Sequence, residues 1–246
     1  MFTRTYPRKK PIVYNDDLYK NFDSFIFDEK TQSLPLDQDP HWQNLIPYFS
    51  DPSFKWGQKV KPGVTLFDMI TWRHRKINFP KIIEGLMRYN GPLDIPVNGV
   101  PFLVTLCGRD NLWQTFNKME TLPTVKDAHG NSFLMLIINR VAAKDYQHWI
   151  SAGFPVNEQN KRGQTALHYI LSATEEHAEA LLKAGADPFI KDENGQDFFD
   201  YLDKRMALAP NKKNEWLMMY KRIKMEQETL KEHTPEVKIQ KSSFRL

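Results

Sequence analysis

The sequence is nearly free of cysteine, and Cys107 is the single one in 246 residues. A lone cysteine excludes an intramolecular disulfide framework and a cysteine-rich zinc site. It also favours a reducing compartment, so we expect a cytoplasmic protein. No apolar run approaches the roughly 20 residues of a membrane span, and the start of the sequence has basic residues but no apolar signal-peptide stretch. We therefore expect no membrane contact.

A strong excess of one charge is also missing. The chain has 34 Lys and Arg against 30 Asp and Glu, which is too balanced for a histone-like nucleic-acid binder. The small excess lies at the C-terminus, where residues 206–246 carry nine basic and five acidic side chains. Hydrophobic residues make up 41% of the chain, which is enough for a packed core.

Common catalytic and cofactor motifs are absent as well. The sequence has no GxxxxGK[ST] or GxGxxG phosphate-binding loop, no GxSxG nucleophile elbow and no HExxH metal motif. Cys107 lies in an apolar stretch, which favours a buried small hydrophobe over a nucleophile. We expect no cofactor, no bound metal and no enzymatic activity.

Aromatic residues, by contrast, are concentrated near the N-terminus, with 12 of the 31 in residues 1–62. Seven prolines interrupt that segment, so we expect an irregular cap that packs its rings against the rest of the chain. One helix start is predicted there, with Asp39 as N-cap and Pro40 at the first helical position. A short strand is predicted at residues 25–27.

An internal repeat dominates the remainder of the chain. Each copy has a glycine followed four residues later by Leu or Phe and seven residues later by Ile or Leu, and successive copies are 36, 31, 33 and 32 residues apart. The apolar pair lies on one face of a helix of about two turns, and a residue suited to a helix start stands two positions after each glycine. The five copies begin at Gly63, Gly99, Gly130, Gly163 and Gly195.

A second helix is predicted in the more complete copies. Apolar residues there precede a further glycine suited to a left-handed helix end, as at Gly91, Gly153 and Gly185. Eight to ten residues then lead to the next repeat glycine, which is enough for a projecting turn. Because one such helix pair cannot bury its apolar face alone, stacked neighbours have to form a continuous core.

The fourth copy carries a family resemblance. NKRGQTALHYIL, followed by EALLKAGADPFIKDENG, resembles an ankyrin repeat, with the letters TALH from Thr165 to His168 in place of the usual Thr-Pro-Leu-His. The resemblance is strongest over residues 127–195 and weak over 63–126. It implies an all-α, ankyrin-type helical-repeat solenoid of about five repeats, in which His168 has a structural role that ties neighbouring turns together.

Three segments follow from this organisation. Residues 1–62 form the N-terminal cap, 63–205 the ankyrin-like repeat array, and 206–246 a C-terminal capping helix with a basic tail. We predict the capping helix within 212–232, and the alternative is a helix offered to a partner's groove. Its apolar residues recur at helical spacing, namely Trp216, Met219, Tyr220, Ile223 and Leu230.

The resemblance also implies where the chain binds. Ankyrin arrays bind other proteins through their concave side, using the turn tips and the exposed face of the first helix of each repeat. Residues at the tips and those just after the repeat glycines are therefore the predicted contacts. They are Lys126, Asp127, His129, Asn131, Gln159, Asn160, Lys161, Arg162, Gln164, Lys191, Asp192, Asn194 and Gln196.

Four arginines occupy the same place in the alignment, ten residues after the repeat glycine. They are Arg73, Arg109, Arg140 and Arg205. In a stack they form a ladder of about 10 Å per rung. One interpretation is that cations stabilise helix C-termini. The other is a basic stripe that binds an acidic partner or a phosphate chain through bidentate contacts.

These patterns favour a non-enzymatic protein-binding module. It would act as an adaptor or inhibitor of one specific protein, such as a host protein, through its concave repeat surface. Two alternatives stay open. The first is a nucleic-acid or nucleotide binder that uses the arginine ladder and the basic tail, and the second is an enzyme built on residues 1–62. The oligomeric state is left open.

Overall fold

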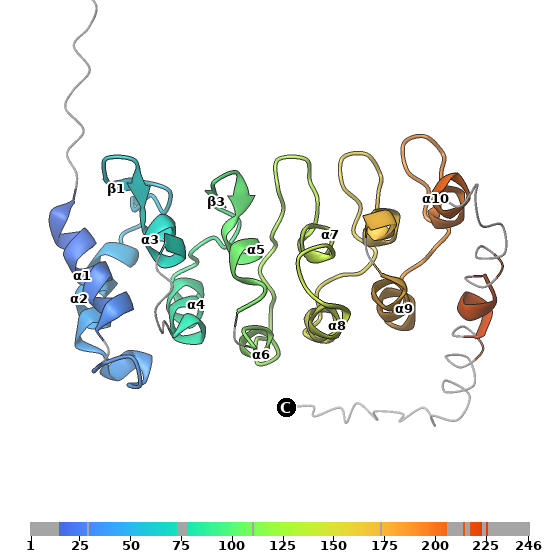
Figure 1. Ribbon diagram of the computed structural model, residues 1–246. Coiled ribbons are helices and arrows are strands. Elements are labelled where there is room, and N and C mark those ends of the chain that lie inside the picture. Colours follow the sequence, from blue (N-terminus) through green and yellow to red (C-terminus); the bar gives the residue numbers. More distant parts are fainter. Residues whose placement is uncertain are drawn as a thin grey trace, which may run out of the picture.

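The computed structural model describes residues 15–28, 30–72, 78–109, 111–172, 174–205, 214, 217–222 and 225. The chain forms an elongated row of helix pairs, with an inner row of helices next to the projecting loops and an outer row beneath it (Figure 1). The inner helices are α3 (Leu66–Trp72), α5 (Phe102–Leu106), α7 (Phe133–Ile137), the 3₁₀ helix η2 (Ala166–Ser172) and α10 (Phe198–Arg205). The outer helices are α4 (Phe79–Arg88), α6 (Trp113–Phe116), α8 (Ala143–Ser151) and α9 (Glu175–Lys183).

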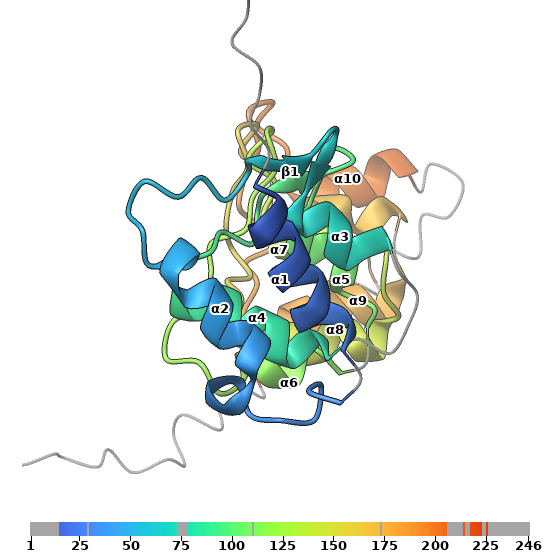
Figure 2. The ribbon, with the colours of Figure 1, turned by 90° about the vertical axis from the view of Figure 1, so that its left-hand side faces the viewer.

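Each inner helix follows a projecting loop, which we call a finger. The five fingers comprise residues 50–65, 89–101, 122–132, 153–165 and 186–197. The first two contain antiparallel strand pairs, β1 (Lys59–Lys61) with β2 (Val64–Thr65) and β3 (Pro96–Val97) with β4 (Val100–Pro101). Seen along the array, the fingers project to the same side (Figure 2). The all-α repeat solenoid expected from the sequence is confirmed, with two short hairpins added to it.

The repeat glycine makes the turn that leads from each finger into its inner helix. In all five copies its φ lies between +72° and +79°, a left-handed conformation that glycine adopts without steric cost. The helix then starts within three residues, often with a reciprocal cap. The Thr65 hydroxyl accepts from the Asp68 amide at 3.2 Å, and the Thr65 amide donates to the Asp68 carboxylate at 2.7 Å. This turn explains why the glycine recurs at nearly constant spacing.

Gly163→Ala is expected to destabilise the array more than Gly195→Ala. Both glycines have φ of +72°, so alanine carries the same left-handed cost of roughly 1–2 kcal/mol at either position. A Cβ at Gly163 would also lie 3.1 Å from the Cα atom of Asp192 in the next finger, whereas a Cβ at Gly195 meets nothing within 4 Å. Chemical denaturation of the two variants measures the difference. Equal losses would contradict the close approach of the fourth and fifth fingers.

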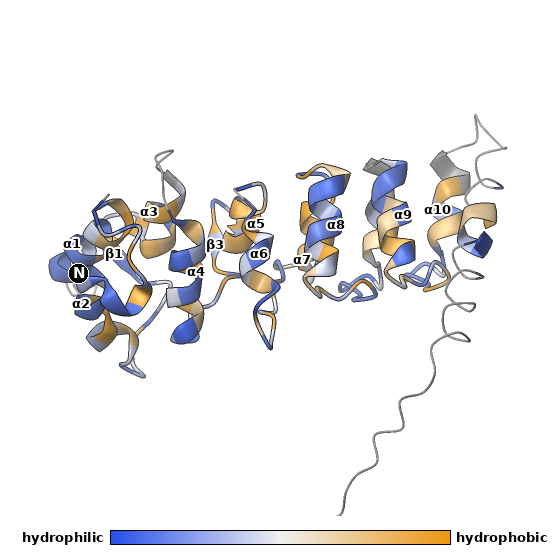
Figure 3. Ribbon diagram, turned by 90° about the horizontal axis from the view of Figure 1, so that it is seen from below, coloured by the Kyte–Doolittle hydropathy of each residue, from blue (hydrophilic) through white to orange (hydrophobic). Residues whose placement is uncertain are grey.

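The hydrophobic core runs along the stack between the two rows of helices. The outer helices α8 and α9 turn mostly hydrophilic residues to the face seen from below (Figure 3). Cys107 is 7% exposed, as expected from its apolar neighbours. The apolar positions four and seven after the glycine are buried wherever their side chains are described, at Phe67, Ile70, Leu103, Leu106, Leu134, Ile137, Leu167, Phe199 and Leu202.

The N-terminal segment differs from the prediction. Instead of an irregular cap, it forms α1 (Asp16–Phe27), the 3₁₀ helix η1 (Leu36–Gln38) and α2 (Pro40–Phe49). The strand predicted at residues 25–27 is wrong, because these residues are the last turn of α1. An apolar run of three residues is too short to separate a strand from a buried helix. The predicted helix start is confirmed, since the Asp39 carboxylate accepts from the first amides of α2.

Aromatic rings pack this helix pair against the first repeat, as the sequence predicts. Trp42 is buried, with its ring centroid 5.2 Å from that of Phe25 and 5.8 Å from that of Tyr89. Gly85 in α4 makes room for the indole, because a Cβ there would lie 2.7 Å from it. The N-terminal helices therefore act as a further helix pair that closes this end of the stack.

The C-terminal cap is described in part. Residues 217–222 are helical, and the Tyr220 ring lies 5.4 Å from that of Phe189 and 6.4 Å from that of Phe199, measured between centroids. This segment therefore covers apolar surface at the last repeat, in agreement with a capping role. Part of the predicted helix lies outside the described residues, as does the basic tail beyond residue 225. The predicted apolar residues concerned are Trp216, Ile223 and Leu230.

Candidate binding surface

Each of the three C-terminal fingers is built around an Asp or Asn side chain at the equivalent position, three residues before the repeat glycine. These residues are Asp127, Asn160 and Asp192. The Oδ1 atom of each accepts from the backbone amides two and four residues later, at 2.8–3.0 Å. Asn160 and Asp192 are buried. All three are among the predicted contacts, but the structure uses their oxygens inside the loop, so their exposed neighbours form the outer surface.

Asp192 shows the electrostatics of this arrangement. Burial acts to raise the pKa of its carboxyl, but the Gln196 amide and the Tyr201 hydroxyl lower it more, so the pKa falls below the usual 3.8. The carboxylate therefore contributes stability that is present above pH 3.8 and lost as the pH falls through the depressed folded pKa. Burial and the neighbouring carboxylate in turn raise the pKa of Tyr201. The fifth finger thus holds a tightly bonded, ionised carboxylate at neutral pH.

The fingers are also bonded to one another through their backbones. The Lys161 amide donates to the His129 carbonyl at 3.1 Å, and the Glu193 amide donates to the Arg162 carbonyl at 2.8 Å. These two bonds occupy equivalent places between the third and fourth and between the fourth and fifth fingers. The tips therefore keep a fixed spacing along the array.

Side chains extend this network beneath the tips. Tyr169 donates its hydroxyl to the Asn131 amide oxygen at 2.8 Å, which joins the fourth repeat to the third. Gln164 donates to the Tyr201 hydroxyl at 2.8 Å, and Tyr201 donates to Asp192 at 2.8 Å. Neither tyrosine was among the residues predicted from the sequence. They stand six residues after the repeat glycine in copies four and five, and this shared position was the available signal.

The exposed part of the surface consists of amide and charged side chains at the tips. Two of its cations have weak internal partners, since Lys161 Nζ donates to the Ala128 carbonyl at 2.8 Å and Arg162 Nε lies 3.9 Å from Glu193. Exposed contacts of this kind contribute little stability, so a partner can replace them. The exposed predicted contacts are His129, Gln159, Lys161, Arg162, Lys191 and Asn194, whereas Lys126, Asn131, Gln164 and Gln196 are half-buried.

His168 and His177 connect neighbouring repeats. The His168 Nδ1 atom accepts from the Thr165 amide at 3.0 Å, which leaves Nε2 to donate to the Gln196 carbonyl of the next repeat at 3.2 Å. His177 Nε2 lies 3.0 Å from the Val141 carbonyl of the preceding repeat. Both rings are buried. The structural role predicted for His168 is confirmed.

The arginine ladder is described at two of its four positions. Arg109 and Arg140 occupy the same place in successive repeats, because their amides donate to the carbonyls three residues earlier at 2.9 and 2.8 Å. Arg73 and the side chain of Arg205 lie outside the described part of the chain.

The described residues contain neither a metal-binding cluster nor a membrane-spanning helix. No group of three or more His, Cys, Asp or Glu side chains lies together in a way that could hold a metal ion there. Nor does any helix in that part of the chain combine the length and the apolar character needed to cross a bilayer.

The repeated unit of left-handed glycine turn, inner helix and outer helix defines the class of the molecule, which is an ankyrin-type repeat solenoid. Larger residues such as Met69 in α3 and Cys107 directly after α5 stand where the ankyrin pattern has small alanines, so the first two copies depart most from that pattern.

No family model matches the sequence, and no curated protein matches it. Several solved structures are similar in fold. One is a chain in the complex of the endopeptidase Bd0816 from Bdellovibrio bacteriovorus with the immunity protein Bd3460, with 15% identity, 82% of this chain and 97% of that chain covered, and a TM-score of 0.45. The ankyrin repeat protein EF0377 has 14% identity, 78% and 94% coverage and a TM-score of 0.48. The ankyrin-repeat fragment of S. cerevisiae Swi6 has 18% identity, 78% and 88% coverage and a TM-score of 0.48.

Proposed function

We propose that the chain is a non-enzymatic protein-binding module that acts as an adaptor or inhibitor of one specific protein. The observation that supports this most is the hydrogen-bond network that joins the third, fourth and fifth fingers. Because the tips keep a fixed spacing, their backbone loses little conformational freedom when a partner binds. Their mixture of amides and charges of both signs suits a polar, specific protein interface.

Cys107 and His168 are the side chains that most resemble catalytic ones, and their chemistry fits a protein that acts by covering its partner. Burial raises the pKa of the Cys107 thiol to about 11, so at neutral pH the residue is a protonated, poor nucleophile. Both ring nitrogens of His168 are engaged inside the protein. The chain would therefore block or recruit its partner by covering part of its surface.

The test begins with capture of binding proteins from the native host on the immobilised full chain, followed by mass spectrometry. The purified partner is then titrated against a finger variant that combines His129→Ala, Arg162→Ala and Lys191→Ala, all at exposed tip positions. We expect at least a tenfold loss of affinity. Lys183→Ala is the matched control, because this exposed lysine of α9 lies on the outer row, where its ammonium pairs with Glu179 at 2.8 Å. Equal affinity of the finger variant and the wild type would contradict the proposal.

Nucleic-acid binding is the alternative, and a gel-shift titration separates the two. Duplex and single-stranded probes are tested at low and physiological salt, because phosphate contacts weaken steeply as salt rises. A retarded band at low salt, lost in an Arg109→Ala, Arg140→Ala variant, would favour the alternative. The absence of any shift at low salt would exclude it.

A further inference from the structure

Arg109 and Arg140 differ from Arg88 and Arg162 in their ion pairing. Arg88 and Arg162 each have a carboxylate partner. In the described part of the chain, neither Arg109 nor Arg140 lies within ion-pair distance of a carboxylate. Arg140 is exposed, and Arg109 is half-buried. Their guanidinium groups are therefore available to a carboxylate from outside the described chain.

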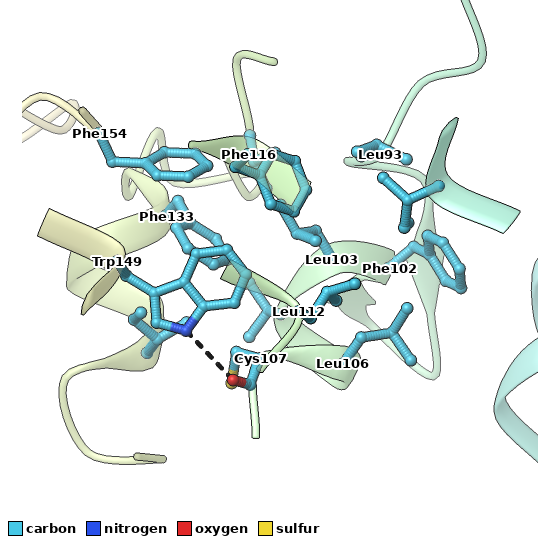
Figure 4. Close-up of a cluster of buried hydrophobic side chains, with 14 of the residues drawn as sticks. Leu93, Phe102, Leu103, Leu106, Cys107, Leu112, Phe116, Phe133, Trp149 and Phe154 are labelled. Carbon is cyan, nitrogen blue, oxygen red and sulfur yellow. Dashed lines mark hydrogen bonds between the residues drawn. The ribbon is translucent and has the colours of Figure 1, made fainter. Parts of the chain in front are cut away.

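The turns that carry the two arginines are held firmly together. The Trp149 indole, fully buried in α8, donates to the Cys107 carbonyl at 3.1 Å, which connects the turn before Arg109 to the repeat that contains Arg140 (Figure 4). The Arg140 charge also acts on the Cys107 thiol and lowers its pKa against the larger effect of burial. The Arg109 guanidinium lies over the Phe79 ring, 5.8 Å from its centroid. Both cations are thus presented by one rigid unit.

We propose that Arg109 and Arg140 together bind an acidic segment of the partner protein, with one carboxylate on each guanidinium. This inference rests on the proposed function and names the chemistry of its partner. The planar fork of arginine binds a carboxylate through two parallel hydrogen bonds. Neighbouring repeats are about 10 Å apart, and a segment in the polyproline II conformation advances about 3.1 Å per residue with three residues per turn, so every third side chain points the same way. Acidic residues three positions apart therefore match the two arginines.

The surroundings favour an acidic protein over a nucleic acid. A polyanion binds best to a continuous basic surface, whereas here acidic residues lie close by. Glu176 lines a cavity together with Asn139 and Val141, the two residues that flank Arg140 in the sequence. Asp145 follows in the first turn of α8. Mixed charge of this kind tolerates two discrete carboxylates better than a row of phosphates.

The test uses a fluorescent synthetic peptide of Glu-Gly-Ser repeats and a control peptide of the same composition with its glutamates clustered at one end. Fluorescence anisotropy measures binding to the full chain at low and physiological salt. We expect the spaced peptide to bind more tightly than the clustered one. Arg109→Ala with Arg140→Ala should weaken its binding at least tenfold and flatten the salt dependence. The Arg109→Lys, Arg140→Lys variant should bind the spaced peptide with an affinity between those of the wild type and the double alanine variant, because lysine keeps the charge without the bidentate fork.

Several results would overturn the inference. These are equal binding of the spaced peptide by the wild type and the double alanine variant, equal binding of the two peptides, or binding of duplex DNA in preference to the peptide. Circular dichroism checks that the variants are folded, and the lysine variant keeps the charge if alanine perturbs the turns. The captured partner separates the two proposals. If the double alanine variant retains that partner and the finger variant loses it, this inference is wrong and the proposed function stands.

Discussion

Trp149→Ala is expected to lower the free energy of unfolding by about 3–5 kcal/mol, the usual range for removing a large aromatic side chain from a core. Trp149 is fully buried. Its ring centroid lies 4.9 Å from that of Phe133, 5.4 Å from that of Phe116 and 5.9 Å from that of Phe154 (Figure 4). The substitution leaves a large cavity between these rings and leaves the Cys107 carbonyl without its indole donor.

The substitution also changes how the molecule unfolds. Stability in a repeat array is approximately a sum of repeat and interface contributions, and Trp149 lies at the interface of the second and third repeats. We therefore expect urea denaturation followed by circular dichroism to show two transitions in the variant. Trp113→Ala is the control. This tryptophan of neighbouring α6 is half-buried and stacks on His148 with centroids 4.1 Å apart, so its loss should cost less. An unchanged midpoint for Trp149→Ala would contradict the packing described.

The features that the sequence predicts well are local ones. A glycine such as Gly163 is needed wherever the turn into a helix takes a positive φ, and the apolar residues four and seven positions later have to face the core. Both requirements depend on a few consecutive residues, so they recur visibly in each copy. The same reasoning located the start of α2, because Asp39 and Pro40 act within one turn.

Apart from the start of α2, the N-terminal segment was expected to be irregular because its prolines were interpreted as breakers of structure. Pro40 occupies the first helical position, where the missing amide has no helical partner to lose. Pro47 lies inside α2, two residues before its end, and the burial of Trp42 and Phe49 holds the helix in spite of it. Tertiary packing against the first repeat, which a count of prolines does not contain, decides the structure here.

Which finger residues are buried and which are exposed could not be predicted from the sequence either. Gln159 and Asn160 are adjacent polar residues, but the first is exposed and the second is 8% exposed. Asn160 is buried because it bonds to Asn131 in the preceding repeat at 2.7 Å. Contacts between residues about 30 positions apart follow from the stacking of whole repeats, so the sequence does not show which residues of a finger are buried and which are exposed.

The other large effect is expected at Lys81, in a buried ion pair that joins α4 to the start of α2. The Lys81 ammonium is buried, 2.5 Å from the Asp39 carboxylate and 2.8 Å from the Thr31 carbonyl. Asp39 is fully buried, so Lys81→Met leaves its charge without a counter-charge. Removing one partner of a buried ion pair costs about 3–5 kcal/mol. Urea denaturation at neutral pH should show a loss of this size.

Asp39→Asn separates the two roles of Asp39. The asparagine oxygen can still cap α2 by accepting from the His41 and Trp42 amides, which now bond to one carboxylate oxygen at 2.8 and 3.2 Å, but it carries no charge. We therefore expect the double variant Lys81→Met, Asp39→Asn to be more stable than Lys81→Met alone, because no unpaired charge stays buried. If the losses in unfolding free energy of Lys81→Met and Asp39→Asn simply add in the double variant, the two charges do not stabilise the protein as a pair. Recovery in the double variant would show that the loss in Lys81→Met comes from the unpaired buried charge and that the ion pair adds little net stability.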